Sequence, residues 1–403
     1  MSSLQDTPRS DRIHIVLVGR RNAGKSSLIN ALTGHRTAIV SDVAGTTTDP
    51  VYKSMEIHGL GPCVLVDTAG FDDEGGLGAL RLEKTADALD KADIAVLVVT
   101  ADGAVDDFAF ERRWLGERRD RAAPCLVALN KTDLLDSAAL GRVTEQVRVA
   151  LGDFVQVSAR TGSGRAAVVE ALLRLLPPDA GRHGITGRLA TEGDMVLLVM
   201  PQDIQAPKGR LILPQVQTLR ELLDKKCVVM SCSTDKLDAA LAALTRPPQL
   251  IITDSQAFAA VYAKKPPESR LTSFSVLMAG YKGDLAAFTA GARALDGLGQ
   301  KSRVLVAEAC THAPLAEDIG RVKIPALLRK KYGDGLRVDM VSGTDFPADL
   351  TPWDLIIHCG ACMFNRAYML SRIRRAAGQG VPVTNYGVAL AALNGILDRI
   401  DLP

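Results

Sequence analysis

A phosphate-binding loop lies near the start of this 403-residue chain. The segment Gly19-Arg20-Arg21-Asn22-Ala23-Gly24-Lys25-Ser26 fits the pattern G-x-x-x-x-G-K-S/T. The backbone N–H groups of such a loop surround phosphates, the lysine places its charge on the β- and γ-phosphates, and the hydroxyl binds Mg²⁺. We therefore expect six residues to hold a nucleoside triphosphate, with Lys25 also catalytic: Asn22, Ala23, Gly24, Lys25, Ser26 and Ser27.

Three later segments predict which nucleotide binds. Asp67-Thr68-Ala69-Gly70 supplies a carboxylate for Mg²⁺ and the Gly70 N–H for the γ-phosphate, so Asp67 and Gly70 are also expected to be catalytic. In Asn130-Lys131-Thr132-Asp133, the Asp133 carboxylate can accept hydrogen bonds from guanine N1–H and from the 2-amino group, which adenine lacks. Ser158-Ala159 suits a contact with guanine O6. The ordered set predicts binding of GTP and GDP with Mg²⁺.

These residues resemble the translation-factor-like GTPases of the Era and tRNA-modification type, over residues 13–176. The resemblance implies that Gly45-Thr46-Thr47-Thr48-Asp49 is the first switch. It implies that Thr47 binds Mg²⁺ and takes part in catalysis, with Thr46 as the alternative. It also implies that Asn22 binds K⁺, and a loop-capping asparagine is the alternative interpretation.

Phe71 follows Gly70 at the position where Ras-like proteins place a water-orienting glutamine. A phenyl ring cannot position water. We therefore expect slow intrinsic hydrolysis of GTP, and we expect K⁺ to stimulate it.

A second group of residues near the C-terminus could bind a metal. The segments are Cys310-Thr311-His312 and His358-Cys359-Gly360-Ala361-Cys362. Each follows an expected strand, and open α/β sheets build their sites beyond the carboxyl ends of strands. Three cysteines and one histidine would complete a structural zinc site, whereas three thiolates could hold a 4Fe–4S cluster with one exchangeable iron position. Spacing alone favours neither metal.

Apolar strand-like runs alternate with helix-period stretches along the chain, which predicts a parallel α/β fold. Stretches at 177–193 and 264–270 read as linkers. The expected domains are a P-loop GTPase domain at 1–176, a small α/β dimerisation domain at 190–264, and a doubly wound α/β domain for the cluster at 271–403. Strands are expected at 13–18, 63–66, 94–99, 126–129, 154–157, 195–200, 228–231, 250–253, 275–278, 304–307, 338–341, 354–357 and 382–384. The middle domain would have three strands, and so small a sheet often completes itself against a second copy.

Composition and charge exclude several classes of function. Lys and Arg number 48 and Asp and Glu number 46, so the net charge is only +2, which gives no support for a polybasic nucleic-acid binder. Aromatic residues make up 4%, too few for an extended base-stacking surface. The polar leader at 1–12 contains no secretory signal, and no apolar run reaches the roughly 18 residues of a membrane helix. We expect a cytoplasmic protein that binds neither nucleic acid nor a membrane.

A GTPase region, a small α/β unit and then C-x-H … H-C-x-x-C resemble the FeFe-hydrogenase maturation GTPases, the HydF family, over nearly the whole chain. The resemblance implies that Cys310, Cys359 and Cys362 ligate a 4Fe–4S cluster, with His312 and His358 as candidates for the open iron position. It implies a homodimer and a scaffold that receives a diiron precursor cluster from two radical-SAM maturases and delivers it to the FeFe-hydrogenase apoprotein. The alternatives are a zinc-stabilised RNA-modification or ribosome-assembly GTPase and a regulatory switch with a structural metal.

Overall fold

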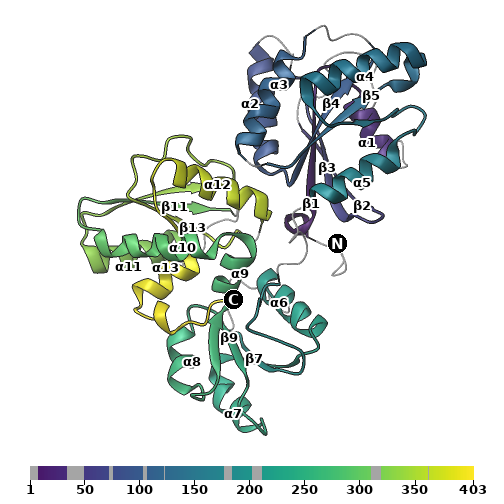
Figure 1. The fold of residues 1–403 in the computed structure, drawn as a ribbon. Coiled ribbons are helices and arrows are strands. Elements are labelled where there is room, and N and C mark those ends of the chain that lie inside the picture. Colours follow the sequence, from purple (N-terminus) through teal and green to yellow (C-terminus); the bar gives the residue numbers. More distant parts are fainter. Residues whose placement is uncertain are drawn as a thin grey trace. The chain divides into compact units, whose positions relative to one another are not determined.

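The computed structural model of the chain describes residues 8–33, 50–71, 76–102, 107–121, 123–176, 184–201, 211–309, 319–361 and 363–403, with only the helical backbone at 76–82. The chain forms two compact units, an N-terminal unit (Met1–Arg182) and a C-terminal unit (His183–Pro403). Both are α/β in architecture, as the sequence predicts (Figure 1). Within the described ranges, no helix has the length and apolar character needed to cross a membrane.

The N-terminal unit is built on a six-stranded sheet in the order β2-β3-β1-β4-β5-β6. All neighbouring pairs are parallel except β2 with β3. The five parallel strands confirm the expected ones, but β2 was not expected. It is an edge strand whose residues are exposed or half-buried except for the buried Ile57, so it lacks the apolar run that marks the others. The strands are β1 (Ile13–Val18), β2 (Val51–Ile57), β3 (Gly61–Asp67), β4 (Ile94–Thr100), β5 (Cys125–Asn130) and β6 (Val155–Gln156).

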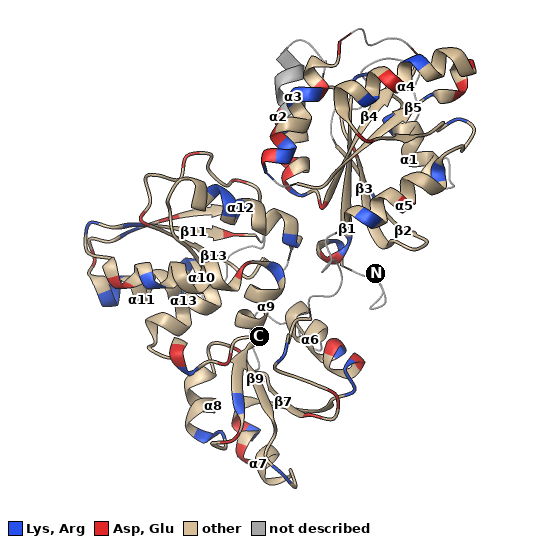
Figure 2. Cartoon of the chain, in the orientation of Figure 1, with Lys and Arg blue, Asp and Glu red and all other residues tan. Residues whose placement is uncertain are grey.

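Apolar cores lie on both faces of this sheet, because successive side chains of a strand point to opposite faces. Ile15 and Leu17 of β1 belong to one core, and Val16 and Val18 belong to the other. The first core includes residues of α1 (Lys25–Thr33) and α5 (Arg165–Leu175). The second includes residues of α2 (Gly76–Asp90), α3 (Ala109–Asp120) and α4 (Ser137–Leu151). Figure 2 shows acidic and basic positions intermixed along α3 and α4.

The C-terminal unit contains two four-stranded parallel sheets. The first sheet has the order β10-β9-β7-β8 and the second has the order β12-β11-β13-β14. The first contains β7 (Met195–Val199), β8 (Val228–Cys232), β9 (Leu250–Thr253) and β10 (Arg270–Ser273). The second contains β11 (Arg303–Glu308), β12 (Arg337–Ser342), β13 (Leu355–His358) and β14 (Val383–Asn385).

Two expectations for this unit were wrong. Residues 275–278 were expected to form a strand but belong to α9 (Phe274–Lys282). The Ser273 side chain caps this helix at the N–H of Val276, and a short buried helix has the same apolar run as a buried strand. Arg270, expected in a linker, begins β10, so the first sheet has four strands rather than three. The other helices are α6 (Leu213–Asp224), α7 (Leu237–Ala242), α8 (Phe258–Lys264), α10 (Leu285–Ala292), α11 (Ile324–Tyr332), α12 (Arg366–Gly378) and α13 (Tyr386–Leu393).

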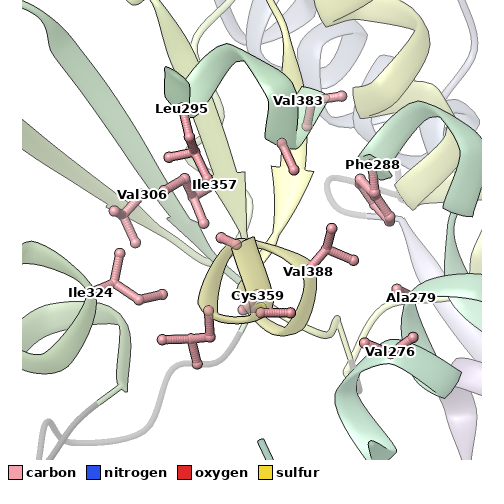
Figure 3. Close-up of a cluster of buried hydrophobic side chains, with 14 of the residues drawn as sticks. Val276, Ala279, Phe288, Leu295, Val306, Ile324, Ile357, Cys359, Val383 and Val388 are labelled. Atoms are coloured by element: carbon pink, nitrogen blue, oxygen red, sulfur yellow. The ribbon is translucent and has the colours of Figure 1, made fainter. Parts of the chain in front are cut away.

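One continuous apolar core joins the two sheets of the C-terminal unit. It runs from Leu197 and Ile251 in the first sheet to Val306 and Ile357 in the second. Figure 3 shows side chains of this core from α9, β11, β13 and α13 gathered around the end of β13, where Cys359 lies. Cys359, one of the predicted metal ligands, therefore belongs to the buried core of the C-terminal unit.

Candidate functional site

The phosphate-binding loop connects β1 to α1 and packs tightly against the sheet. Gly24 has a φ of 89°, and a Cβ at this position would lie 2.3 Å from Nδ2 of Asn130. Only glycine combines this backbone conformation with so close an approach. Asn22 has a φ of 58°, which asparagine tolerates better than most residues. That agrees with the loop-conformation alternative, and the role of Asn22 toward K⁺ stays a prediction.

The Lys25 ammonium is bound by backbone carbonyl groups of the same loop. Its Nζ donates to the carbonyl oxygens of Gly19 and Arg20, both at 2.9 Å. The side chain is buried and its charge is held where the pattern predicts phosphate oxygens. Ser26 and Ser27 follow in the first turn of α1.

A hydroxyl and a carboxylate meet beside the lysine. Ser26 Oγ donates to Oδ2 of Asp67, which ends β3 next to Leu17 of β1. Asp67 is only 5% exposed, and its buried Oδ1 has no hydrogen-bond partner among the described residues. Burial raises the pKa of Asp67, against the Ser26 hydrogen bond and the charges of Lys25 and Lys53. A buried carboxylate oxygen without a partner next to a hydroxyl fits Mg²⁺, which prefers such oxygen ligands.

The segment after Asp67 is anchored at both ends. Thr68 Oγ1 donates to the carbonyl oxygen of Leu17 at 2.7 Å. Gly70 is buried, and the ring of Phe71 stacks on Phe110 of α3 with centroids 4.2 Å apart. The residue at the glutamine position is thus held against α3 and presents no polar group to water. Thr47 lies outside the described residues.

Asn130 links the phosphate loop to the predicted base-binding segments. Its Nδ2 donates to the carbonyl oxygen of Ala23 at 2.9 Å, and its Oδ1 accepts from the N–H of Ala159 at 3.0 Å. Ser158 Oγ donates to Oδ1 of Asp133 at 2.6 Å. That hydrogen bond is the main cause of a lowered pKa of the Asp133 carboxyl, so its charged, accepting form is favoured.

Lys131 is the remaining nucleotide-binding residue predicted in this segment. Lys131 has a φ of 64°, and its Nζ pairs with Oδ2 of Asp102 at 2.6 Å. Hydrogen bonds therefore join Ser26 to Asp67, Asn130 to Ala23 and Ala159, and Ser158 to Asp133.

Sequence reasoning missed a polar anchor of the loop. Arg20 Nε lies 2.6 Å from Oε1 of Glu111 on α3, and Glu111 is buried. Both Arg20 and Phe71 thus contact residues in the first turn of α3, Glu111 and Phe110. The residues of each pair lie far apart in the sequence, and no local pattern connects them.

Cys359 follows β13 at the carboxyl edge of the second sheet. Its N–H donates to Ala307 on β11 at 2.9 Å, and its side chain is 9% exposed. Its Sγ accepts from the N–H of Ala309 at 2.9 Å and of Ala361 at 3.4 Å. Two amide donors stabilise sulfur in its thiolate form, which is the form that binds metals.

The two residues that donate to Cys359 Sγ each precede another predicted ligand. Cys310 follows Ala309 and Cys362 follows Ala361 in the sequence. Cys310, His312 and Cys362 lie outside the described residues. Among the residues that are described, no three metal-ligating side chains lie together. The geometry around Cys359 nevertheless fits a thiolate-bound metal or cluster, because its sulfur accepts hydrogen bonds from two backbone amides.

The second segment is followed by α12, which begins at Arg366 because Asn365 Oδ1 accepts from the N–H of Tyr368 and caps the helix. The His358 ring is buried, and both of its nitrogens lie at hydrogen-bond distance from atoms of this chain, the carbonyl oxygen of Cys359 and Nη1 of Arg372. Arg372 was not predicted for this centre.

Comparisons with family models match three consecutive parts of the chain. The model of a 50S ribosome-binding GTPase matches residues 14–131. The hydrogen maturase F dimerization domain matches residues 185–283, and the hydrogen maturase F tetramerization domain matches residues 286–401.

Individual relatives match the first part of the chain. It is 37% identical over 180 residues to the tRNA modification GTPase MnmE of Ralstonia nicotianae, covering 43% of this chain and 36% of that protein. It is 39% identical over 171 residues to MnmE of Pseudomonas aeruginosa strain UCBPP-PA14, covering 40% and 35%. The chain thus spans about a third of the length of these curated relatives. A crystal structure of Era in complex with MgGDPNP and 16S ribosomal RNA nucleotides is 17% identical, covers 58% of this chain and 98% of its own, and has a TM-score of 0.37.

Proposed function

The chain belongs to the hydrogen maturase F family, and we propose that it is the GTP-hydrolysing iron–sulfur scaffold of FeFe-hydrogenase maturation. Two domain models of that family match 185–283 and 286–401, behind a GTPase region. The observation that carries the scaffold role is the Cys359 sulfur, which accepts two amide hydrogen bonds from the residues preceding Cys310 and Cys362. Such an arrangement suits three thiolates around one cluster.

In the N-terminal unit, the chain's own residues would bind GTP and prepare its hydrolysis. Lys25 would exchange its two carbonyl partners for the β- and γ-phosphate oxygens. Ser26 and Asp67 would hold Mg²⁺ together with Thr47, or with Thr46 as the alternative. When bound, Mg²⁺ supplies positive charge to the phosphates. Gly70 would donate its N–H to the γ-phosphate, while Asp133 and Ser158 select guanine.

Hydrolysis would be slow and stimulated by K⁺. The ring of Phe71 is stacked on Phe110, so this position leaves water unoriented. Asn22 in the phosphate loop is the residue proposed to hold K⁺ near the phosphates. A cation there could neutralise developing charge, which is the role that an arginine finger has in other GTPases.

In the C-terminal unit, Cys310, Cys359 and Cys362 would ligate a 4Fe–4S cluster, and His312 is a candidate for the remaining iron position. The cluster would provide the attachment point for the diiron precursor, which is the cargo rather than a resident cofactor. Two radical-SAM maturases would load that cargo, and the FeFe-hydrogenase apoprotein would receive it.

The chain would also assemble with copies of itself, as the names of both matching domains indicate. In the first sheet, β8 is an edge strand, and its Val228 is 53% exposed. An edge strand leaves backbone groups unpaired and is a common place for a second copy to add. This supports the expected homodimer through residues 190–264.

The test is the metal content of protein purified without oxygen. We expect a brown protein with bound iron and sulfide and a low-temperature EPR signal after reduction. A colourless protein with one zinc per chain would refute the scaffold role and favour the zinc-stabilised RNA-modification GTPase. GTP turnover measured on the same sample tests the N-terminal site independently.

A further inference from the structure

A buried arginine contacts His358, the residue that precedes the predicted cluster ligand Cys359. Arg372 of α12 is 3% exposed, yet no carboxylate among the described residues pairs with its guanidinium. Its Nη1 lies 2.8 Å from Nε2 of His358, and its Nη2 donates to the carbonyl oxygen of Gly343 at 2.7 Å and to the hydroxyl of Tyr368 at 3.1 Å. A buried charge is costly unless another group compensates it.

Three aromatic rings fix the position of this guanidinium. Its Cζ lies 4.6 Å from the ring centroids of Phe346 and Tyr368 and 4.7 Å from that of Phe364. Rings at such distances attract a cation and hold the planar group in one orientation. Burial lowers the pKa of Arg372, and the nearby Tyr368 and Cys359 act in the opposite direction. The arginine nevertheless stays charged, because a guanidinium does not deprotonate in proteins.

The contact with Arg372 determines how His358 can act. A guanidinium has only donors, so Nε2 of His358 must be the acceptor of this hydrogen bond. The proton of the neutral ring therefore lies on Nδ1, which donates to the carbonyl oxygen of Cys359 at 3.0 Å. With a ring that is 1% exposed and both nitrogens engaged, His358 has no lone pair available for iron. The chain of contacts runs from Arg372 through His358 to the backbone of Cys359.

We propose that Arg372 and His358 form a positioning pair for the cluster, in which Arg372 compensates its negative charge and His358 orients Cys359 instead of ligating iron. This inference rests on the proposed function, because the compensated charge is that of the thiolate cluster. The positive charge stabilises the more negative, reduced state of the cluster, since nearby charge and hydrogen bonding set the potential of such clusters. Of the two histidines in the motif, His312 then remains the candidate for the open iron position.

The first test measures the reduction potential of the reconstituted, full-length protein by an EPR-monitored titration. Arg372→Gln removes the charge but keeps an amide donor, and we expect a more negative potential. Arg375→Gln is the matched control: it removes the same charge from the same helix, 5.9 Å from the Phe346 ring centroid, without the contact to His358. Its potential should shift less than that of Arg372→Gln, and Arg372→Lys should recover part of the loss. Equal potentials in the wild type and in Arg372→Gln overturn the charge role.

The second test needs no arginine variant and therefore does not depend on whether Arg372→Gln folds. Protein with ¹⁵N-labelled histidine is reduced, and the nitrogen couplings of the cluster are measured by pulsed EPR. We expect the spectrum of His358→Asn to keep any strong coupling that the wild type shows. A strong coupling that disappears in His358→Asn would assign His358 as an iron ligand and refute the pair. A wild-type protein without any cluster signal would instead refute the proposed function itself.

Discussion

The two candidate centres lie at the same structural position, beyond the carboxyl ends of parallel strands, but they are held in opposite ways. Around Lys25 and Asp67, polar side chains hydrogen-bond to one another and to carbonyl oxygens of the phosphate-binding loop. Around Cys359, the sulfur lies at the edge of a continuous apolar core and receives backbone amides. The first arrangement suits a ligand that binds and leaves, and the second suits a resident inorganic group.

In each centre, the residues that would contact the ligand differ from the residues that hold them in place. In both centres the residues that would touch the ligand are in short segments. In both, the residues that fix those segments come from elsewhere, Glu111 and Phe110 on α3 for the first centre and Arg372 on α12 for the second. If the two centres are independent, a change in one should leave the property measured at the other intact.

The largest effect is expected for Lys25→Ala. This variant removes the charge facing the β- and γ-phosphates, and loss of one such electrostatic contact typically costs about 10²–10³ in turnover. GTP hydrolysis should therefore fall by that order, while iron per chain stays at the wild-type value, because no cluster ligand is changed. The measurement is phosphate release and iron content on the same anaerobic samples. A loss of both iron and GTP turnover in this variant would contradict the independence of the two centres.

Cys359→Ser should have the reciprocal effect. A serine oxygen is a harder ligand than a thiolate and holds iron–sulfur clusters poorly, so most of the iron should be lost. GTP turnover should stay within a few-fold of the wild type. Cys227→Ser is the matched control in the same unit, because Cys227 is buried and its Sγ donates to the carbonyl oxygen of Thr191, a contact that a hydroxyl can also make. Cys310→Ser and Cys362→Ser should behave like Cys359→Ser, and full iron in all three would refute the assignment of the cluster to these thiols.

Most strands could be predicted from the sequence, because buried parallel strands are apolar runs. The nucleotide-binding motifs and the cysteine-containing segments could also be predicted, because each consists of residues that are contiguous in the sequence. The edge strand β2 could not be predicted, since its exposed and half-buried residues form neither an apolar run nor a strict alternation. Residues 275–278 were assigned to a strand because a helix buried on nearly all sides has no amphipathic period. The residues that hold the two ligand-binding segments in place could not be predicted from the sequence either. Phe71 and Phe110, or His358 and Arg372, meet only after the chain has folded.

A moderate effect is expected from the monovalent cation. Phe71 packs against α3 and cannot orient water, so a cation held by Asn22 is the proposed source of additional charge neutralisation. Turnover in KCl should exceed turnover in NaCl several-fold at matched ionic strength, and Asn22→Ala should remove that difference. Equal rates of the wild type in both salts would leave Asn22 with its loop-conformation role alone. The iron content should not respond to either salt.

The smallest effect concerns a cysteine that serves only the core, and it sharpens the contrast with Cys359. Cys63 on β3 is fully buried in the N-terminal unit, and burial raises the pKa of its thiol to about 11 from an ordinary value of 9.0. Between those two values the unfolded chain loses this proton while the folded chain keeps it. Stability should therefore fall as the pH rises above 9, by up to about 2–3 kcal/mol for this group.

Cys63→Ala has no thiol to ionise, so its urea unfolding should lack that part of the pH dependence, although removal of the buried sulfur should lower its stability at pH 7 by about 1–2 kcal/mol. The chain has two tryptophans, Trp114 in the N-terminal unit and Trp353 in the C-terminal unit. Unfolding of the first unit can thus be followed by Trp114 fluorescence in a Trp353→Phe background, at pH values from 7 to 10.5. Parallel pH profiles of the two proteins would show that the Cys63 thiol ionises equally in the folded and unfolded states. Iron content should be the same in both, since Cys63 lies in the core of the N-terminal unit and is not one of the three predicted cluster ligands.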